Sequence, residues 1–210
     1  MMEWNSGCKL VRSRRKTLAI EVSKRGEVVV RAPLRMPERR IARFVRDNAN
    51  WIARTRAETL AKVAVGQKRF EPGGQFLYLG RWFSFEAIVF GAKYDDPRDH
   101  VKAWYRDRAR RLIASRCELI ASQHGYDYAK VRVSSAKRIW GSCSGQNAIS
   151  ISWRTVMAPL ECVDYVILHE LAHTVHKNHG VRFWHRVEKA MPEYREHRQW
   201  LRDNEHLMNL

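Results

Sequence analysis

The spacing of apolar side chains changes along the chain, and the spacing predicts the local element. Residues 16–22 place apolar side chains at every second position, and residues 27–32 are rich in β-branched residues, with Gly26 between the two runs. This pattern predicts a β-hairpin. From Pro37 to residue 56 the apolar positions recur every three to four residues, and arginines occupy the other faces. That period predicts one amphipathic helix.

The same reading extends over the rest of the chain. Residues 75–79 and 82–89 predict a second hairpin, and a long helical period runs from Arg98 to His124 and stops at Gly125. Two further strands are expected at residues 130–139 and 148–153, on either side of a turn at 140–145. Further helices are expected after Pro159, at residues 181–191 and at residues 195–208.

The composition is that of a globular protein. Hydrophobic residues make up 45% of the 210 residues, which is enough to build a core. We divide the chain into an N-terminal β-rich part with one amphipathic helix, residues 1–97, and a C-terminal core, residues 98–210. We expect the two parts to pack as one compact unit.

Two absences narrow the class of protein. The four cysteines are widely spread and form no CxxC pair, which disfavours a structural zinc cluster and a disulfide framework. The N-terminus has no signal-peptide pattern, and no run approaches 18 consecutive apolar residues. We therefore expect a cytoplasmic protein with no membrane insertion.

The chain is strongly basic. It has 39 Lys and Arg against 22 Asp and Glu, a formal net charge of +17. Such a surplus favours an anionic partner, of which nucleic acid is the commonest, with acidic membranes or proteins as rivals and a solvated basic surface as the plain alternative. The densest basic group is expected on the long helix, and it comprises Arg106, Arg108, Arg110, Arg111 and Arg116.

The most informative stretch is an H-E-x-x-H pattern inside an apolar helix. His169 and His173 are four residues apart and share one helix face, so both imidazoles can reach one metal ion. Glu170 lies roughly 100° round the helix, close enough to bind a water held by the metal. Zn²⁺ with three protein ligands keeps a fourth position for water and lowers its pKa to about 7. The pattern therefore indicates a zinc-dependent hydrolase with Glu170 as its base.

The third ligand has two candidates. His179 follows His173 by six residues and lies beyond the expected helix end, so a turn could aim it at the metal from another direction. His176 lies on the same helix surface, about 60° from His173. Geometry favours His179, but His176 remains open as a ligand. The competing interpretation is a pair of histidines on a solvated helix. It does not explain why the Glu170 carboxylate lies in apolar surroundings, where an unpaired charge is costly.

These motifs resemble one known family. H-E-L-A-H-x5-H, the G-V-R-F-W that follows it and the preceding W-G-S-C-S are similar to the YgjP-like family of predicted zinc metallopeptidases. The resemblance implies an α+β, zincin-like fold, in which a small, mostly antiparallel sheet packs on the metal helix. It also implies one Zn²⁺ per chain on His169, His173 and His179, with Glu170 as general base. The family in turn resembles SprT-like proteases, which digest proteins attached to DNA.

The segment before the metal helix departs from the family pattern in one place. The family usually has Arg directly before W-G-S-C, whereas this chain has Ile139 there and Arg138 one position earlier.

The residues of the W-G-S-C-S segment, which we call the rim residues, are expected to form a turn at the edge of the cleft. There they could bind the substrate backbone. They are Trp140, Gly141, Ser142, Cys143 and Ser144. The alternative of Cys143 as a nucleophile lacks a dedicated base.

The sequence thus favours a zinc metallopeptidase that acts on a protein or peptide, including proteins associated with nucleic acid. Two alternatives remain: a metal-dependent nucleotide pyrophosphatase, which no glycine-rich phosphate loop supports, and a basic nucleic-acid-binding module with a structural zinc. The sequence places neither Tyr165 nor Tyr194 relative to the metal, so neither is assigned to the oxyanion of the transition state.

Overall fold

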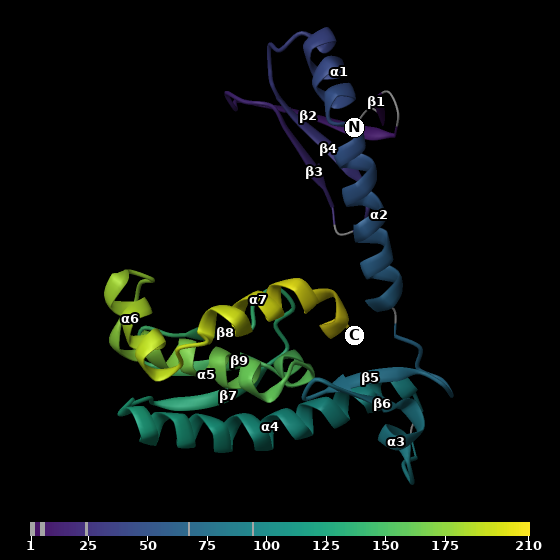
Figure 1. Cartoon of the computed structure of the whole chain (residues 1–210). Coiled ribbons are helices and arrows are strands. Elements are labelled where there is room, and N and C mark those ends of the chain that lie inside the picture. Colours follow the sequence, from purple (N-terminus) through teal and green to yellow (C-terminus); the bar gives the residue numbers. More distant parts are fainter. Residues whose placement is uncertain (1–2, 5–6, 24, 67, 94) are drawn as a thin grey trace. The chain divides into compact units, whose positions relative to one another are not determined.

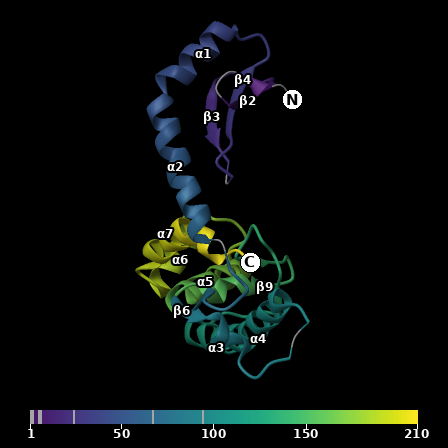
Figure 2. The same cartoon turned by 90° about the vertical axis from the view of Figure 1, so that its right-hand side faces the viewer.

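The chain folds into two compact units, residues 1–67 and residues 68–210, which we call the N-terminal and C-terminal units (Figure 1, Figure 2). The computed structural model describes residues 3–4, 7–23, 25–66, 68–93 and 95–210. The boundary drawn from the sequence at residue 97 lies inside the C-terminal unit. This difference arises because the hairpin that includes Phe76 and Leu77 buries both side chains in the core of that unit.

A four-stranded sheet underlies the N-terminal unit. Its spatial order is β1-β2-β4-β3, and the strands are β1 (Glu3–Trp4), β2 (Cys8–Ser13), β3 (Ala19–Val22) and β4 (Val28–Pro33). β3 and β4 pair antiparallel, which confirms the first predicted hairpin. β2 pairs parallel with β4 and was not predicted. Its charged residues, Lys9 and Arg12, leave most of the strand only half-buried, so no apolar alternation marks it.

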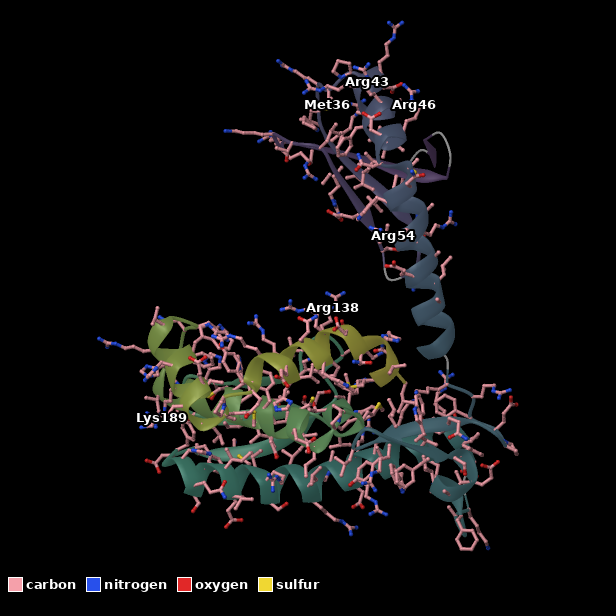
Figure 3. All side chains as sticks on the ribbon, in the orientation of Figure 1. Met36, Arg43, Arg46, Arg54, Arg138 and Lys189 are labelled. Carbon is pink, nitrogen blue, oxygen red and sulfur yellow. The ribbon has the colours of Figure 1, made fainter. Side chains whose placement is uncertain are left out.

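Two helices accompany this sheet where one was predicted. α1 (Glu38–Asp47) and α2 (Ala49–Gly66) are separated at Asn48, whose side-chain amide donates to the Phe44 carbonyl at 2.8 Å. Ile41 of α1 is fully buried among the apolar residues of β2 and β4. Arg43 and Arg46 project from the opposite side of the helix (Figure 3).

The C-terminal unit begins with a hairpin and a short helix. β5 (Gln75–Tyr78) and β6 (Arg81–Ser84) pair antiparallel, as predicted, but β6 ends at Ser84 and α3 (Phe85–Val89) follows. The prediction of a strand as far as residue 89 was therefore wrong. Ser84 caps the helix by accepting from the backbone N–H of Ala87, and Phe85 and Ile88 are buried at helical spacing.

The long helix α4 (Pro97–His124) follows the sequence prediction closely. Asp96 caps its start, and Gly125 ends it with a left-handed backbone at φ 66°. Arg116 of α4 makes a two-pronged ion pair with Asp164 of the metal helix, so it does not belong to an open basic face as expected. The pair ties α4 to the helix that carries the candidate ligands.

A three-stranded sheet lies beside that helix. Its spatial order is β7-β9-β8, formed by β7 (Lys130–Ser134), β8 (Gly141–Cys143) and β9 (Ala148–Ser152). β8 and β9 pair antiparallel, but β7 and β9 pair parallel, so the sheet is mixed and not mostly antiparallel. The expected turn at residues 140–145 was wrong in part, because β8 occupies its centre. β7 stops at Ser134, and residues 135–140 cross over to the far side of β9.

Helices complete the unit. They are η1 (Trp153–Met157), α5 (Leu160–Val175), α6 (Val181–Ala190), α7 (Tyr194–Asn204) and η2 (Glu205–Met208). α5 is the central helix, and its residues from Cys162 to Leu168 are all buried. None of the helices in the described part of the chain combines the length and the apolar character needed to cross a membrane. The architecture is a mixture of helices and small sheets around α5.

Candidate metal centre

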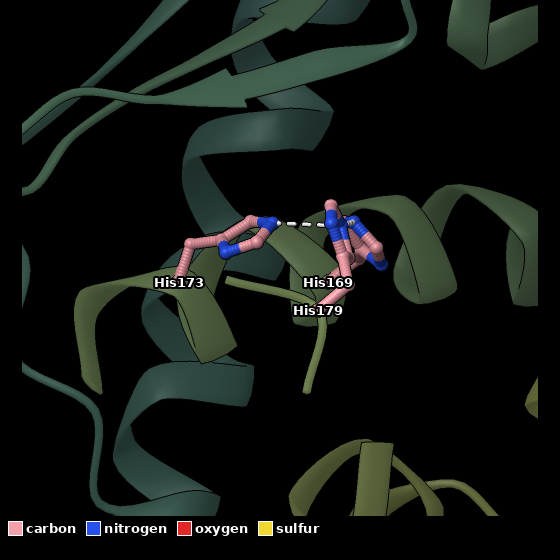
Figure 4. A group of neighbouring side chains, drawn as sticks. All are labelled: His169, His173 and His179. Carbon is pink, nitrogen blue, oxygen red and sulfur yellow. Dashed lines mark hydrogen bonds between the residues drawn. The ribbon is translucent and has the colours of Figure 1, made fainter. Parts of the chain in front are cut away.

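Three histidines converge at the end of α5 (Figure 4). His169 and His173 extend from one face of the helix, with ring centroids 5.0 Å apart, as their four-residue spacing requires. His179 comes from the segment between α5 and α6. Its Nε2 atom lies 2.9 Å from Nε2 of His169 and 3.1 Å from Nε2 of His173. The structure thus brings together the three residues that the sequence favoured as ligands.

The group has the dimensions of a metal site. A tetrahedral ion with metal–nitrogen bonds of about 2.0–2.1 Å holds its ligand atoms about 3.3 Å apart. The two Nε2 separations are close to this value, and the candidate ligand atoms all lie within 4.8 Å of one another. Imidazole nitrogens that present lone pairs to one another at this distance repel unless a cation lies between them. The residues present therefore fit a metal ion.

The end of α5 fixes the tautomer of His173. The helix stops at Val175, and the carbonyl of His176 lies 2.9 Å from Nδ1 of His173. A carbonyl can only accept, so Nδ1 carries the proton and Nε2 presents its lone pair to the metal position. His176 thus contributes its backbone, and its imidazole is not among the converging ligand atoms within the described residues. Nδ1 of His169 is buried with no partner in the same described set.

Aromatic rings from α6 pack behind the three histidines. The Phe183 ring centroid lies 4.9, 4.5 and 4.9 Å from those of His169, His173 and His179. Trp184 stacks on His179 at 5.7 Å. This apolar backing excludes water from one side of the site. Burial, followed by the nearby His173 and His179, lowers the pKa of His169 to about 3, so its imidazole is neutral and able to ligate.

Glu170 lies inside the protein beside this group. Its side chain is 6% exposed, and burial raises the pKa of its carboxyl to about 7. Gly141 of β8 packs directly against it: a Cβ atom at position 141 would lie 2.6 Å from Cγ and 2.7 Å from Oε1 of Glu170. Only glycine leaves room for the carboxylate in its present position. A buried carboxylate next to a metal position can exchange a proton with a bound water.

The rim residues form the edge strand of the sheet. The backbone N–H of Ser152 donates to the Trp140 carbonyl, and the N–H of Ser144 donates to the Ala148 carbonyl. In an antiparallel pair the hydrogen-bonded positions alternate, so Trp140, Ser142 and Ser144 face β9. The backbone groups of Gly141 and Cys143 therefore point away from β9, toward the open edge. This edge begins next to Glu170.

Cys143 does not have the surroundings of a nucleophile. Burial raises the pKa of its thiol, partly offset by Lys177, and the nearby Glu170 raises it further. A thiol with a raised pKa stays protonated and is a poor nucleophile. Lys177 also donates to the Ser144 carbonyl at 3.2 Å, which ties the segment that bears His179 to the rim.

A cavity of about 390 Å³ opens beside His169 and Glu170. Part of its wall is Tyr165, which comes from the same helix as both residues. Burial raises the pKa of Tyr165 to about 12, so its hydroxyl stays neutral. Three arginines also line the cavity, and sequence reasoning missed the two on α7 because no spacing relates α7 to α5. They are Arg138, Arg198 and Arg202.

Three comparisons relate this chain to known proteins. The sequence matches the YgjP-like family, as a YgjP-like metallopeptidase domain, over residues 16–204. A similar solved structure is the metallopeptidase zymogen of Pyrococcus abyssi abylysin, with 24% identity and a TM-score of 0.40. The match covers 43% of this chain and 93% of that one. A search of curated proteins finds no match.

Proposed function

The chain belongs to the YgjP-like metallopeptidase family, and we propose that it is a zinc-dependent peptidase with Glu170 as its general base. The proposed ligands are His169, His173 and His179. One observation carries the proposal: three imidazole nitrogens converge next to buried Glu170, which lies on the helix that bears His169 and His173. A set of nitrogen ligands with the spacing of a tetrahedral ion is typical of zinc.

Each residue has a separate part in the proposed reaction. A zinc ion held by the three histidines would supply Lewis acidity and lower the pKa of a water molecule in the site. Glu170 takes a proton from the attacking water and later delivers it to the leaving amine. Its carboxylate packs against Gly141. Phe183 keeps bulk water from the back of the site.

The edge of β8 is the proposed binding place of the substrate backbone. An extended peptide can add to an open strand edge through main-chain hydrogen bonds. The outward backbone groups of Gly141 and Cys143 would pair with such a peptide and bring one of its bonds to Glu170. We therefore propose that the rim binds the substrate backbone as a strand, where the sequence led us to expect a turn.

Charge supports a proposal about partners. The N-terminal unit has 16 Lys and Arg against six Asp and Glu, a net +10 of the total +17. We propose that this unit attracts an anionic macromolecule, with nucleic acid as the first candidate, and that the substrates include proteins bound to it. The peptidase proposal does not depend on this second statement.

The first test is zinc per chain, measured by elemental analysis. The wild type is expected to hold about one zinc, and His179→Ala is expected to lose most of it. His176→Ala is the matched control, since it keeps the backbone carbonyl that orients His173. Retention of zinc by His179→Ala together with its loss from His176→Ala would replace the third ligand.

The second test separates hydrolysis from metal binding. Glu170→Gln keeps the size of the side chain but removes the base, so peptide hydrolysis should fall about 10²–10⁴-fold while zinc stays bound. Glu161→Gln, at an exposed position in the first turn of the same helix, should leave the rate unchanged. Hydrolysis of nucleotides in place of peptides, abolished in Glu170→Gln, would favour the pyrophosphatase. Full activity of Glu170→Gln would contradict both hydrolase functions.

A further inference from the structure

The cavity beside Glu170 has an unusual concentration of positive charge. Its lining includes the guanidinium-bearing residues Arg138, Arg198 and Arg202, against the carboxylates of Glu170 and Glu205. A metal ion on the histidines would add further positive charge to the same space. An anionic group is therefore the favoured occupant.

Two of the arginines come from one face of α7. Arg198 and Arg202 are four residues apart, and like charges at this spacing on a helix repel each other. The repulsion is relieved when an anion lies between them. Arg198 is also held in place, because its guanidinium lies over the Trp184 ring at 5.0 Å from the centroid. Trp184 itself stacks on His179, so this arginine is anchored close to the metal position.

The third arginine comes from the segment that crosses from β7 to β8. Arg138 is exposed, lines the cavity and is labelled in Figure 3. Buried Arg154 holds this crossing segment in place, because it donates hydrogen bonds to the carbonyls of Ser135 and Ala136. The shift of Arg138 by one position from the family pattern thus leaves its side chain in the lining of the cavity.

The cavity also has an apolar part to its wall. Val166 of α5, Leu201 of α7 and Trp140 line it together with the arginines and Glu170. A short aliphatic stem can pack on this wall while its charged end reaches the guanidinium groups. A planar guanidinium binds a carboxylate through two parallel hydrogen bonds, which gives geometric selectivity as well as charge.

We propose that Arg138, Arg198 and Arg202 form a specificity pocket for a substrate carboxylate adjacent to the cleaved bond. The proposal rests on the proposed peptidase function. The carboxylate belongs either to an Asp or Glu side chain or to the free C-terminus of the substrate, since both present the same group. The cavity of about 390 Å³ is large enough for either.

The test compares peptides that differ only in this group. Cleavage sites are first located in a peptide mixture by mass spectrometry. Matched peptides then carry Glu or Gln next to the cleaved bond, with an amidated C-terminus, and a second pair carries a free or an amidated C-terminus. The zinc-loaded wild type should prefer one carboxylate over its amide about tenfold or more in kcat/KM. The pair that shows the preference identifies the source of the carboxylate.

The variants test which residues cause the preference. Arg198→Gln and Arg202→Gln should each reduce the preference to about threefold or less, mainly through KM, while hydrolysis of the amide peptide is retained. Arg195→Gln is the matched control, because Arg195 lies on α7 but pairs with Glu188 outside the cavity. It should keep the full preference. Equal rates for acid and amide in both pairs would overturn the proposal without affecting the peptidase function.

Binding supplies a readout that does not depend on turnover. Zinc-loaded Glu170→Gln should bind the preferred acidic peptide about tenfold more tightly than its amide partner by calorimetry, and Arg198→Gln in that background should remove the difference. Equal affinity for the two peptides would overturn the pocket. Absence of all peptide hydrolysis in the wild type would instead contradict the proposed function, and calorimetry with both the Glu/Gln pair and the free/amidated C-terminus pair would then decide the pocket.

Discussion

At the scale of single residues, backbone groups position the chemistry of the centre. The carbonyl of His176 fixes the proton of His173 on Nδ1, and the bare Cα of Gly141 leaves the space that Glu170 fills. The first contact lies within the end of α5, and the second joins β8 to α5. A side chain added at position 141 would therefore act on the carboxylate and not on the histidines.

Gly141→Ala tests this arrangement. Its Cβ would come within 2.7 Å of Glu170 Oε1 and closer still to Cγ, so the buried carboxylate has to move. A displaced base loses its alignment with the water, and we expect kcat for peptide hydrolysis to fall about 10–100-fold. The zinc content should stay at that of the wild type, since the three atoms nearest to the added Cβ all belong to Glu170.

The control for this variant lies in the same hairpin. A Cβ at Gly145 meets no atom within 4 Å, so Gly145→Ala should keep both kcat and zinc. Steady-state kinetics and elemental analysis of the two variants provide the comparison. An unchanged kcat in Gly141→Ala would show that Glu170 tolerates the shift and that its position is not the limiting feature.

At the scale of secondary structure, the sequence predicts those helices and strands whose signals lie within their own residues and do not depend on pairing with another segment. α4 was predicted almost to the residue, because its apolar period and Gly125 stop are both local. β8 was missed, because its three residues carry no apolar alternation and become a strand only by pairing with β9. The parallel pairing of β7 depends on a crossing segment held by buried Arg154, which no local pattern reveals.

The pair between α4 and α5 makes a testable contribution to stability. Asp164 and Arg116 form two charge-assisted hydrogen bonds, and their side chains are only 12% and 27% exposed. Asp164→Asn leaves the guanidinium half-buried without its counter-charge, so the free energy of unfolding should fall by about 2 kcal/mol. Denaturant unfolding of the metal-free protein measures this change without a contribution from zinc.

A surface pair on α4 is the control for that variant. Asp107 and Arg111 are largely exposed, and Asp107→Asn should change the free energy of unfolding by less than about 0.5 kcal/mol. Equal changes in the two variants would mean that the tie between α4 and α5 contributes no more than a surface ion pair.

At the scale of the whole molecule, the sequence predicts the candidate site residues that lie on one helix or just after it. His169, Glu170 and His173 follow from helical spacing alone, and His179 follows from a nearby helix stop. Arg198 and Arg202 line the same cavity, but they come from a helix whose packing against α5 depends on the tertiary fold. The division of the chain was also beyond local patterns, because it depends on which core buries the second hairpin.

Charge is a property of the whole molecule, and its distribution leads to the last prediction. Four arginines lie exposed on the ten residues of α1: Arg39, Arg40, Arg43 and Arg46. Two of the α4 arginines have partners within the C-terminal unit, since Arg106 donates to Ser135 and Arg111 pairs with Asp107. We therefore expect α1, and not α4, to supply the phosphate contacts in any complex with nucleic acid.

Two variants with the same reduction of charge separate these surfaces. One replaces the four α1 arginines by Gln, and the other replaces four of α4: Arg106, Arg108, Arg110 and Arg111. Binding to a DNA duplex is measured over a range of salt concentrations. In the α1 variant, the slope of the logarithm of the DNA-binding constant against the logarithm of the salt concentration should flatten by about 1 for each arginine–phosphate pair that is removed. In the α4 variant, the slope should stay near the wild-type value. Greater flattening in the α4 variant would assign phosphate binding to that helix, and a wild-type affinity that does not respond to salt would exclude phosphate binding by either surface.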